Sequence, residues 1–317
     1  MTQGKRVLVS GAGGFIGRWS IPALLRSGFE VHAVLSGNPG RGLPAQLRGA
    51  KTHYADLLDG SQVDELLDRV KPTHLLHFAW IATPGLYWSS KDNYRWLSAS
   101  EHLLRVFRTH GGRRAVLAGS CAEYDWSRVT VCDERTSPLA DESPALLTPY
   151  AECKIALQRT LADFGRDAQL STAWGRIFFQ FGPHEHPDRL VPSVISNLLL
   201  NREAPCSHGR QIRSFLHVAD VGAAFAAVLD SELAGPVNIG SGERISVADL
   251  IERIGREIGR GELVRLGARP ETRPEPPLLV PEIHRLRDEA GWQPRFTLNE
   301  GINDTIAWWR SRLLEKK

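Results

Sequence analysis

Short apolar runs alternate with amphipathic stretches over the first 177 residues of the chain. The strand-like runs cover residues 5–10, 30–35, 51–55, 74–79, 114–119 and 170–177, and helix-like stretches lie between them near 15–27, 61–70, 92–110 and 149–165. Strands that alternate with helices predict an α/β fold, a doubly wound parallel sheet with helices on both faces. Ligands of such folds bind at the carboxyl ends of the strands.

The pattern changes after Arg176. One helix is predicted near 189–200, and strand-like runs at 212–216 and 236–240 flank a helix at 218–230. After them come a helix at 246–258, a proline-rich connector at 270–281 and short helices at 283–290 and 299–312. We therefore predict a larger Rossmann domain of residues 1–177 and 211–241. Residues 178–210 and 242–317 form a smaller C-terminal domain, which we expect to wrap over the sheet edge.

Composition narrows the class of protein. The 317 residues are 42% hydrophobic and 24% charged, with a net charge of +3 and dispersed Lys and Arg, so we expect no nucleic-acid partner. No apolar run reaches the roughly 18–20 residues of a membrane span, and the chain enters its first strand at once, so we expect neither membrane contact nor a signal peptide.

The four cysteines are Cys121, Cys132, Cys153 and Cys206, and none stands in a Cys-x-x-Cys pair. This pattern favours a reducing, cytoplasmic compartment and predicts no metal site. We interpret the four as small buried residues or free thiols.

A glycine-rich turn, Gly11-Ala12-Gly13-Gly14-Phe15-Ile16-Gly17, connects the first strand to the first helix. Glycines let the backbone turn tightly and let a pyrophosphate approach the helix N-terminus, where free N–H groups favour anions. A plain strand-to-helix connection would have the same composition. Its position after the first strand of a doubly wound sheet favours a dinucleotide site.

Two further patterns carry candidate chemistry. Tyr150 and Lys154 are four residues apart in a predicted helix, so they share a face, and the ammonium would favour ionisation of the phenol. Ser120 ends the fifth predicted strand, where its hydroxyl would reach a ligand. Either pattern alone occurs by chance, but together with the glycine turn they are much more specific.

These residues resemble the extended short-chain dehydrogenases/reductases of the NDP-sugar epimerase/dehydratase superfamily. Further matches span the chain, at residues 54–57, 77–79, 93, 176–178, 181–183, 190–192, 213–221 and 238–240. The resemblance implies a catalytic triad of Ser120, Tyr150 and Lys154, and an NAD(P) site that includes Gly11, Gly14, Phe15, Ile16, Gly17, Asp56, Leu57, Ala79, Tyr150 and Lys154. It implies that Arg213 and Arg273 hold the nucleotide diphosphate of a sugar substrate; His217 and Asp220 we interpret as structural.

Three departures from the family pattern select among reactions. Cys121 and Ala122 stand where the 4,6-dehydratases have an Asp-Glu pair, so we expect no dehydratase activity. Leu35, eighteen residues after Gly17, replaces the carboxylate that binds the ribose of NAD, and Ser36, Arg41 and Arg18 nearby favour the 2′-phosphate of NADP. Phe179 replaces an Asn near the sugar and Trp80 a small residue, so we expect both to contact the substrate in an altered pocket.

We therefore predict an NADPH-dependent 4-ketoreductase of an NDP-4-keto-6-deoxyhexose. Tyr150 would protonate the alkoxide, Ser120 would bind the keto oxygen, and Lys154 would orient the cofactor ribose and lower the pKa of Tyr150. An NDP-hexose 4-epimerase with tightly bound NAD is the main alternative; a reductase of a non-sugar ketone and a cofactor-binding regulator stay open. By resemblance, we expect a homodimer formed through the helices near 92–110 and 149–165.

Overall fold

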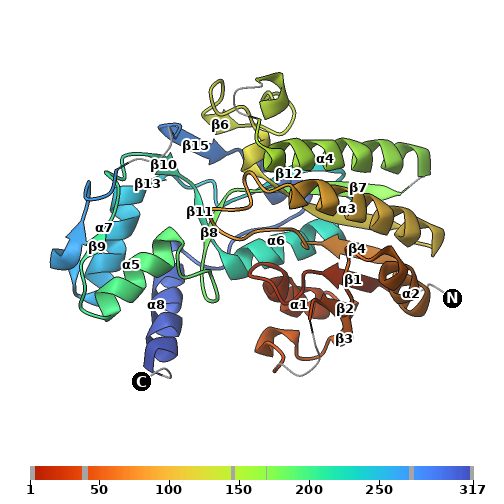
Figure 1. The fold of residues 1–317 in the computed structure, drawn as a ribbon, viewed down its shortest axis with the longest axis horizontal. Helices are drawn as coiled ribbons and strands as arrows, with labels where there is room; N and C mark the ends of the chain where they lie inside the picture. Colours follow the sequence, from red (N-terminus) through yellow and green to blue (C-terminus); the bar gives the residue numbers. More distant parts are fainter. Residues whose placement is uncertain (1–3, 38–41, 144–146, 169, 271–274, 315–317) are drawn as a thin grey trace.

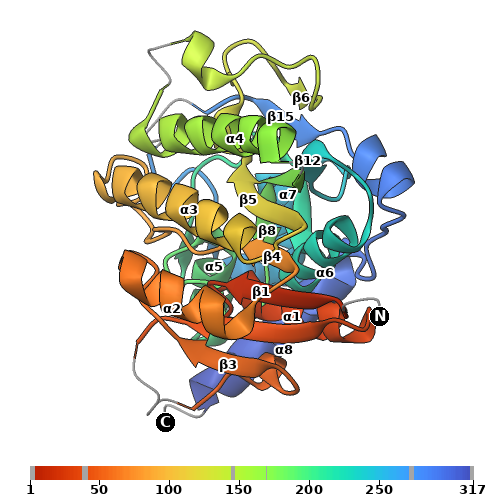
Figure 2. The same cartoon turned by 90° about the vertical axis from the view of Figure 1, so that its right-hand side faces the viewer.

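The structure is a computed structural model that describes residues 4–37, 42–143, 147–168, 170–270 and 275–314. Its centre is a seven-stranded, entirely parallel sheet with the strand order β12-β7-β5-β4-β1-β2-β3 (Figures 1 and 2). The strands are β1 (Arg6–Ser10), β2 (Glu30–Leu35), β3 (Lys51–Tyr54), β4 (His74–His77), β5 (Arg114–Ser120), β7 (Ser171–Ile177) and β12 (Gly235–Ile239). The strand order turns back between β1 and β4, which is where doubly wound folds bind their ligands.

Helices cover both faces of the sheet, as predicted. α1 (Gly17–Arg26) and α6 (Val218–Asp230) pack on one face, and α2 (Gly60–Val70), α3 (Asp92–Thr109) and α4 (Pro149–Ala168) on the other. Successive side chains of a strand point to opposite faces, and β1 follows this rule: Val7 and Val9 lie in the α1/α6 core and Leu8 in the α2/α3/α4 core. The predicted α/β class with a Rossmann-type sheet is confirmed.

A second region, drawn in green and blue on the left of Figure 1, has a core of its own. It contains α5 (Leu190–Leu199), α7 (Val247–Ile258) and α8 (Leu298–Leu314), whose apolar side chains meet there. Short strands complete it: β6 (Val131–Cys132), β8 (Phe179–Phe181), β9 (Ala204–Pro205), β10 (Ile212–Arg213), β11 (Phe215–His217), β13 (Ile245–Ser246), β14 (Val264–Arg265) and β15 (Leu278–Pro281). The exact domain boundaries stay a prediction.

The structure corrects four details of the sequence analysis. The run at 212–216 is two strands in different sheets, because β10 pairs with β13 and β15 while β11 pairs with β8. The connector at 270–281 ends in strand β15, and the short helix expected at 283–290 is a π-helical turn, Arg285–Glu289. The second region lies across the carboxyl ends of the large sheet's strands rather than over its edge, since residues of both line one cleft.

Candidate active site

A cleft of about 1140 Å³ runs along the carboxyl ends of the large sheet. Its walls include every predicted site residue that the structure describes: Gly11, Gly14, Phe15, Ile16, Gly17, Ser36, Asp56, Leu57, Ala79, Trp80, Ser120, Tyr150, Lys154, Phe179 and Arg213. Arg41 and Arg273 lie outside the described residues. Segments from Gly11 to Glu275, far apart in the chain, therefore meet around a single space that is large for one small ligand.

The glycine turn is shaped so that side chains are excluded from it. Gly11 has a φ of +63°, and the carbonyl oxygen of Gly11 accepts a hydrogen bond from the Gly14 N–H at 2.9 Å. A Cβ atom at Gly17 would lie 2.2 Å from that oxygen, and one at Gly14 would lie 3.0 Å from it. This leaves the start of α1 open to the cleft, and the turn therefore fits the pyrophosphate of a dinucleotide.

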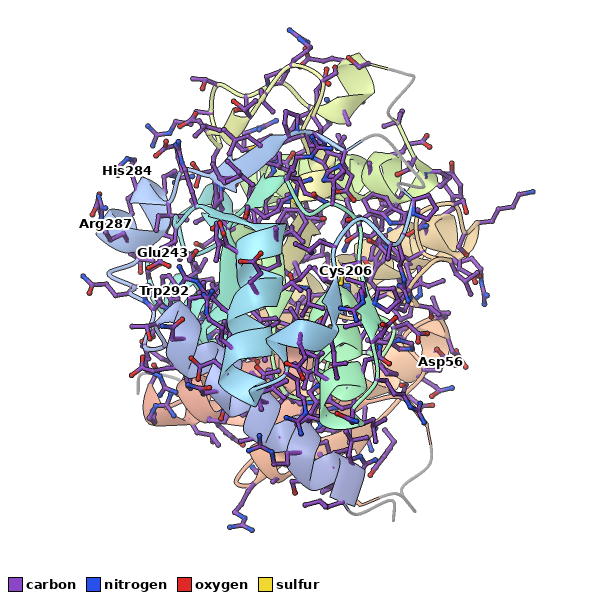
Figure 3. All side chains as sticks on the ribbon, turned by 90° about the vertical axis from the view of Figure 1, so that its left-hand side faces the viewer. Asp56, Cys206, Glu243, His284, Arg287 and Trp292 are labelled. Atoms are coloured by element: carbon purple, nitrogen blue, oxygen red, sulfur yellow. The ribbon has the colours of Figure 1, made fainter. Side chains whose placement is uncertain are left out.

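The end of β2 is apolar, as its sequence predicts. Leu35 is buried, and its Cδ2 atom is 3.0 Å from the place where a Cβ at Gly13 would stand. Ser36 follows it on the cleft wall, and among the described residues that line the cleft near Leu35 the one carboxylate is the exposed Asp56, at the right edge of Figure 3. Arg18 is not part of this wall, because its guanidinium donates to the carbonyl oxygens of Gly13 and Gly14.

Below the middle of the cleft, a buried hydrogen-bonded chain joins β1, β4 and α3. The Ser10 hydroxyl lies 2.6 Å from Nδ1 of His77, and Nε2 of that ring lies 2.9 Å from the Ser100 hydroxyl. The main-chain N–H groups of Phe78 and Ala79 also point at the Ser10 oxygen. Burial lowers the pKa of His77 to about 3, so the ring is neutral and serves as a structural link.

Lys154 is buried at the floor of the cleft. Its Nζ donates to the carbonyl oxygen of Ala118 at 2.9 Å and lies 3.8 Å from the centre of the Trp80 ring, which it faces as a cation–π contact. Burial lowers the pKa of this lysine to about 7. Trp80 is therefore placed against the triad itself, and its indole N–H is held by the Asn93 side-chain oxygen at 2.8 Å.

Tyr150 projects from the first turn of α4 into a group of aromatic rings. The centres of the Tyr87 and Trp88 rings lie 4.9 and 5.6 Å from that of Tyr150, both edge-on, and Trp126 stands behind Trp88 at 6.0 Å. Burial raises the pKa of Tyr150, and a hydrogen bond with Ser120 opposes the rise. The expected lowering by Lys154 is absent from this geometry, because its ammonium sits 5.9 Å from the centre of the Tyr150 ring, on Trp80.

Ser120 ends β5 and caps the short turn that follows. Its hydroxyl oxygen accepts the N–H of Ala122 at 3.2 Å, and its side chain lines the cleft beside Tyr150. The two residues that follow, Cys121 and Ala122, are buried, and they bring no carboxylate to the position next to Ser120. All four cysteines are buried and free, as predicted.

The far wall of the cleft carries a buried arginine. The Arg213 guanidinium donates to the main-chain oxygens of Ile212 and Pro276 and to the Glu275 carboxylate at 2.8 Å, and lies 5.2 Å from the centre of the Phe179 ring. Its Nε has no hydrogen-bond partner among the described residues. A buried guanidinium with a donor to spare is suited to hold an anionic oxygen.

Sequence reasoning missed two acidic residues of the cleft, Glu275, which pairs with Arg213, and Glu185. Glu185 follows the Gly182-Pro183 turn, and its Oε2 is buried with no hydrogen-bond partner among the described residues. Burial raises the pKa of this carboxyl to about 8. No sequence signal distinguishes Glu185 from other loop acids, since its burial depends on packing between regions far apart in the chain.

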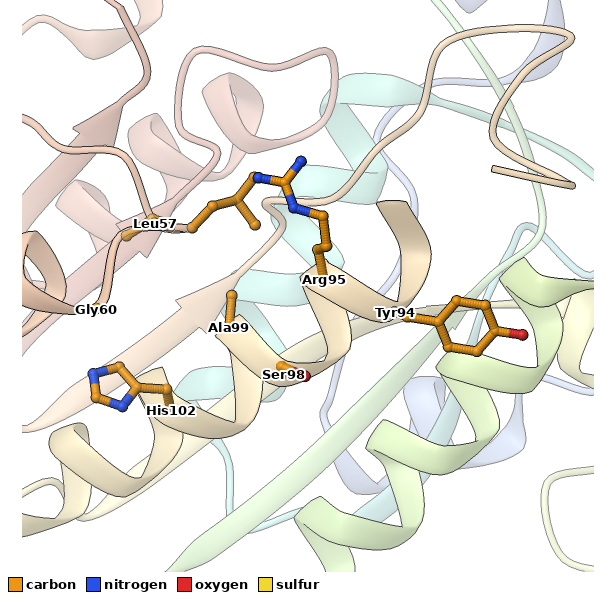
Figure 4. Close-up of a pocket in the computed structure, with 8 residues that line it drawn as sticks. Leu57, Gly60, Tyr94, Arg95, Ser98, Ala99 and His102 are labelled. Carbon is orange, nitrogen blue, oxygen red and sulfur yellow. The ribbon is translucent and has the colours of Figure 1, made fainter. Parts of the chain in front are cut away.

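A second hollow, of about 530 Å³, lies outside the cleft between the start of α2 and α3 (Figure 4). Arg95 and His102 of α3 line it together with Leu57 and Gly60, and Leu57 also lines the main cleft. Tyr94 at its end donates a hydrogen bond to Glu152 of α4 at 2.8 Å. None of the triad residues takes part in it.

Comparison with known proteins identifies the class. The model of the "NAD dependent epimerase/dehydratase family" matches residues 7–240. The chain is 27% identical to a human dTDP-D-glucose 4,6-dehydratase (96% of this chain, 90% of the relative) and 26% identical to a UDP-glucose 4-epimerase of Bacillus subtilis (97% of each). The fold matches a UDP-glucose 4-epimerase structure from Thermotoga maritima with a TM-score of 0.82 at 20% identity, over 97% of this chain and 99% of that one.

Fold and family match define an enzyme of the extended short-chain dehydrogenase/reductase class that uses NAD(P). Within that class, the chain belongs to the NAD dependent epimerase/dehydratase family. Among the helices of the described segments, none combines the length and apolar character that a bilayer crossing requires.

Proposed function

We propose that this protein reduces the keto group of a nucleotide-linked 4-keto-6-deoxyhexose with NADPH. One observation carries the proposal: the cleft presents Ser120, Tyr150 and Lys154 together, while the positions after Ser120 hold Cys121 and Ala122. A hydroxyl, a phenol and an ammonium suit transfer of hydride and proton at a carbonyl. Elimination of water would require an acid and a base at positions that carry neither here.

The carboxylate nearest to Ser120 in sequence is that of Glu123, and it cannot act on a substrate. It is fully buried, it is not part of the cleft wall, and both of its oxygens are bonded to protein groups. This supports a reductase over a dehydratase, although the human relative carries the name of a dehydratase. At 27% identity, the reaction in that relative's name does not transfer to this chain.

In the proposed mechanism, Ser120 donates a hydrogen bond to the keto oxygen and Tyr150 transfers its proton to the alkoxide that forms. The raised pKa of Tyr150 keeps the phenol protonated, which suits a proton donor. Lys154 orients the cofactor ribose with the N–H groups that Ala118 does not use. The nicotinamide supplies the hydride when bound. Arg213, together with Arg273, would hold the diphosphate.

The choice of NADP over NAD rests on the end of β2. Leu35 fills the position from which a carboxylate would bind a ribose 2′-hydroxyl and repel a 2′-phosphate, and Ser36 offers a hydroxyl beside it. Arg41 is the proposed cation for that phosphate. A reductase gains from this choice, because NADPH is the cell's pool of reducing equivalents for synthesis.

The experiment combines a cofactor and a substrate comparison. Purified protein is mixed with NADPH or NADH and a panel of NDP-4-keto-6-deoxyhexoses, and absorbance of the reduced cofactor is followed. We expect turnover with NADPH, a higher kcat/KM than with NADH, and an NDP-6-deoxyhexose product. Absence of turnover with every NDP-keto sugar, in protein shown to bind NADPH, would overturn the proposal.

A second candidate is an NDP-hexose 4-epimerase with tightly bound NAD. It is favoured by the likeness to a Bacillus subtilis UDP-glucose 4-epimerase along 97% of both chains. Such an enzyme would use Tyr150 first as a base, and the raised pKa of that phenol weighs against it. Two observations together would favour the epimerase over the reductase: release of NAD(H) when the purified protein is denatured, and epimerisation of an NDP-hexose without added cofactor.

We further propose a homodimer formed through α3 and α4. The two helices pack side by side and are joined by the bond between Tyr94 and Glu152, and Tyr94 is 43% exposed although aromatic. The free, buried state of the cysteines is compatible with the cytoplasmic location that we propose. Sedimentation of wild-type protein against a Tyr94→Glu variant tests the interface; a monomeric wild type would contradict it.

A further inference from the structure

A carboxylate lies beneath the triad without touching the cleft. Glu123 is fully buried at the end of β5, and its Oε1 accepts the main-chain N–H of Ser120 at 2.7 Å. Its Oε2 accepts from the Trp174 indole N–H at 2.9 Å and from Nε of Arg176 at 2.8 Å. One side chain thus connects the strand that carries Ser120 to the neighbouring strand β7.

The backbone of β5 makes room for this carboxylate. A Cβ atom at Gly119 would lie 2.1 Å from Nε1 of Trp174 and 2.5 Å from Oε1 of Glu123. Any residue other than glycine would therefore displace Glu123 or Trp174. Position 119 is therefore restricted to glycine as long as Glu123 and Trp174 keep these places.

The charges around Glu123 come from several elements. Arg176 of β7 forms a 2.8 Å ion pair with it, and the Tyr124 ring lies 4.6 Å from that guanidinium. On α4, the Lys154 and Tyr150 side chains interact electrostatically with Glu123, and the Lys154 ammonium lies 5.9 Å from the centre of the Trp174 ring, whose indole N–H donates to that carboxylate. Cys153 adjoins the lysine in the chain, and His77 of β4 is its neutral neighbour. Burial lowers the pKa of Lys154 to about 7, and the negative charge of Glu123 opposes that shift.

We propose that Glu123 is a positioning residue of the active site, which ties the Ser120 backbone to β7 and supplies the buried negative charge opposite the Lys154 ammonium. The inference rests on the roles proposed above for Ser120 and Lys154. An ion pair serving only to join β5 to β7 would be replaceable by apolar side chains, since buried pairs contribute little net stability. Here the acid also accepts the main-chain N–H of Ser120, and its charge opposes the effect of burial on the Lys154 pKa.

The test measures the protonation of Lys154 directly and does not depend on turnover. The chain has seven lysines, so a protein labelled with ¹³C-lysine has few side-chain signals, and the Lys154→Arg variant identifies the one that is lost. We expect the wild-type Lys154 signal to titrate near neutral pH and the midpoint of Glu123→Gln to fall by about one pH unit or more. A role in strand pairing alone would leave the midpoint unchanged.

Further variants keep the test decisive. Glu123→Gln leaves Arg176 buried without its partner and can fail to fold, so Glu123→Gln/Arg176→Gln removes both charges together. The midpoint of this double variant is compared with that of Arg176→Gln, and the same direction of change, a lower midpoint in the double variant, is expected because the two differ only in the Glu123 charge. Glu134→Gln is the matched control: this acid is also buried, but it accepts from the Asn238 N–H, away from the triad. It should leave the midpoint where it is. Equal midpoints in the folded double variant and in Arg176→Gln overturn the proposal.

Turnover provides a second readout. With a substrate found in the panel, kcat of the Glu123 variant should fall about tenfold or more near pH 8 and by a smaller factor near pH 6, where Lys154 of the variant is still partly protonated, while KM changes little. If no substrate is turned over, the proposed function fails, yet the lysine titration still decides the role of Glu123.

Discussion

The two ends of the cleft are built by different means. The end that we propose binds the cofactor is a local structure, in which closely spaced glycines and the first turn of α1 present main-chain groups, and the opposite end is proposed to bind the substrate. The substrate end is assembled by side chains from distant segments, with Arg213 of β10 held by Glu275 and with Tyr87 and Trp88 beside Tyr150. The first end is therefore sensitive to added volume, and the second to changes of charge and shape.

The largest effect is expected where the two ends meet. Tyr150→Phe removes the proton donor but keeps the ring packed between Tyr87 and Trp88. Turnover of the keto sugar should fall by about 10²–10⁴-fold, while affinity for the reduced cofactor changes little. Stopped-flow oxidation of NADPH and its fluorescence on binding measure the two quantities. Unchanged turnover would refute the role of Tyr150.

Added volume should disable the cofactor end. The new methyl group of Gly17→Ala would stand 2.2 Å from the Gly11 carbonyl oxygen, so the turn must open. We expect cofactor affinity to fall about 10- to 100-fold, measured by fluorescence titration. Gly261→Ala is the control, since no atom lies within 4 Å of its Cβ position, and it should bind as wild type. Equal affinity of both variants would show that the turn does not hold the cofactor.

A pair of charge changes should separate the substrate end from the cofactor end. Arg213→Gln removes the buried guanidinium, and affinity for an NDP should fall about 10- to 100-fold. Glu275→Gln removes the half-exposed acid that occupies this arginine, and NDP affinity should rise up to about fivefold. Calorimetry with an NDP measures both, and NADPH affinity should stay constant. Changes in the same direction would mean that Arg213 does not meet the diphosphate.

The smallest effect concerns stability and pH. The pKa of Glu185 is raised from 4.5 to about 8, so the folded protein holds a proton that the unfolded chain releases between those values. Its burial therefore costs more stability as pH rises through that window. Glu185→Gln removes this cost, and its Tm advantage over wild type should grow from pH 5 to pH 8. The exposed Glu243→Gln should show no such trend; a flat difference for Glu185→Gln would contradict its raised pKa.

Much of the first 177 residues was predictable because its signals are local. The alternation of runs predicts the sheet and its helices, and the spacing of Gly11, Gly14 and Gly17 predicts the turn, since both depend on residues close in sequence. The short strands of the second region were missed or merged because two or three residues carry no periodicity. Their pairing is decided by distant partners, as β10 shows with β15.

By itself, the sequence determined the α/β class, the family, and the candidates Ser120, Tyr150 and Lys154, because motifs record residue types and spacing. Only the tertiary structure decided their environments. It buried Lys154 against Trp80, placed Tyr150 among aromatic rings, and brought Glu123 under the triad through Gly119 and Arg176. The physical reason is that burial and charge, which set the pKa values of these groups, depend on atoms supplied by segments far apart in the chain.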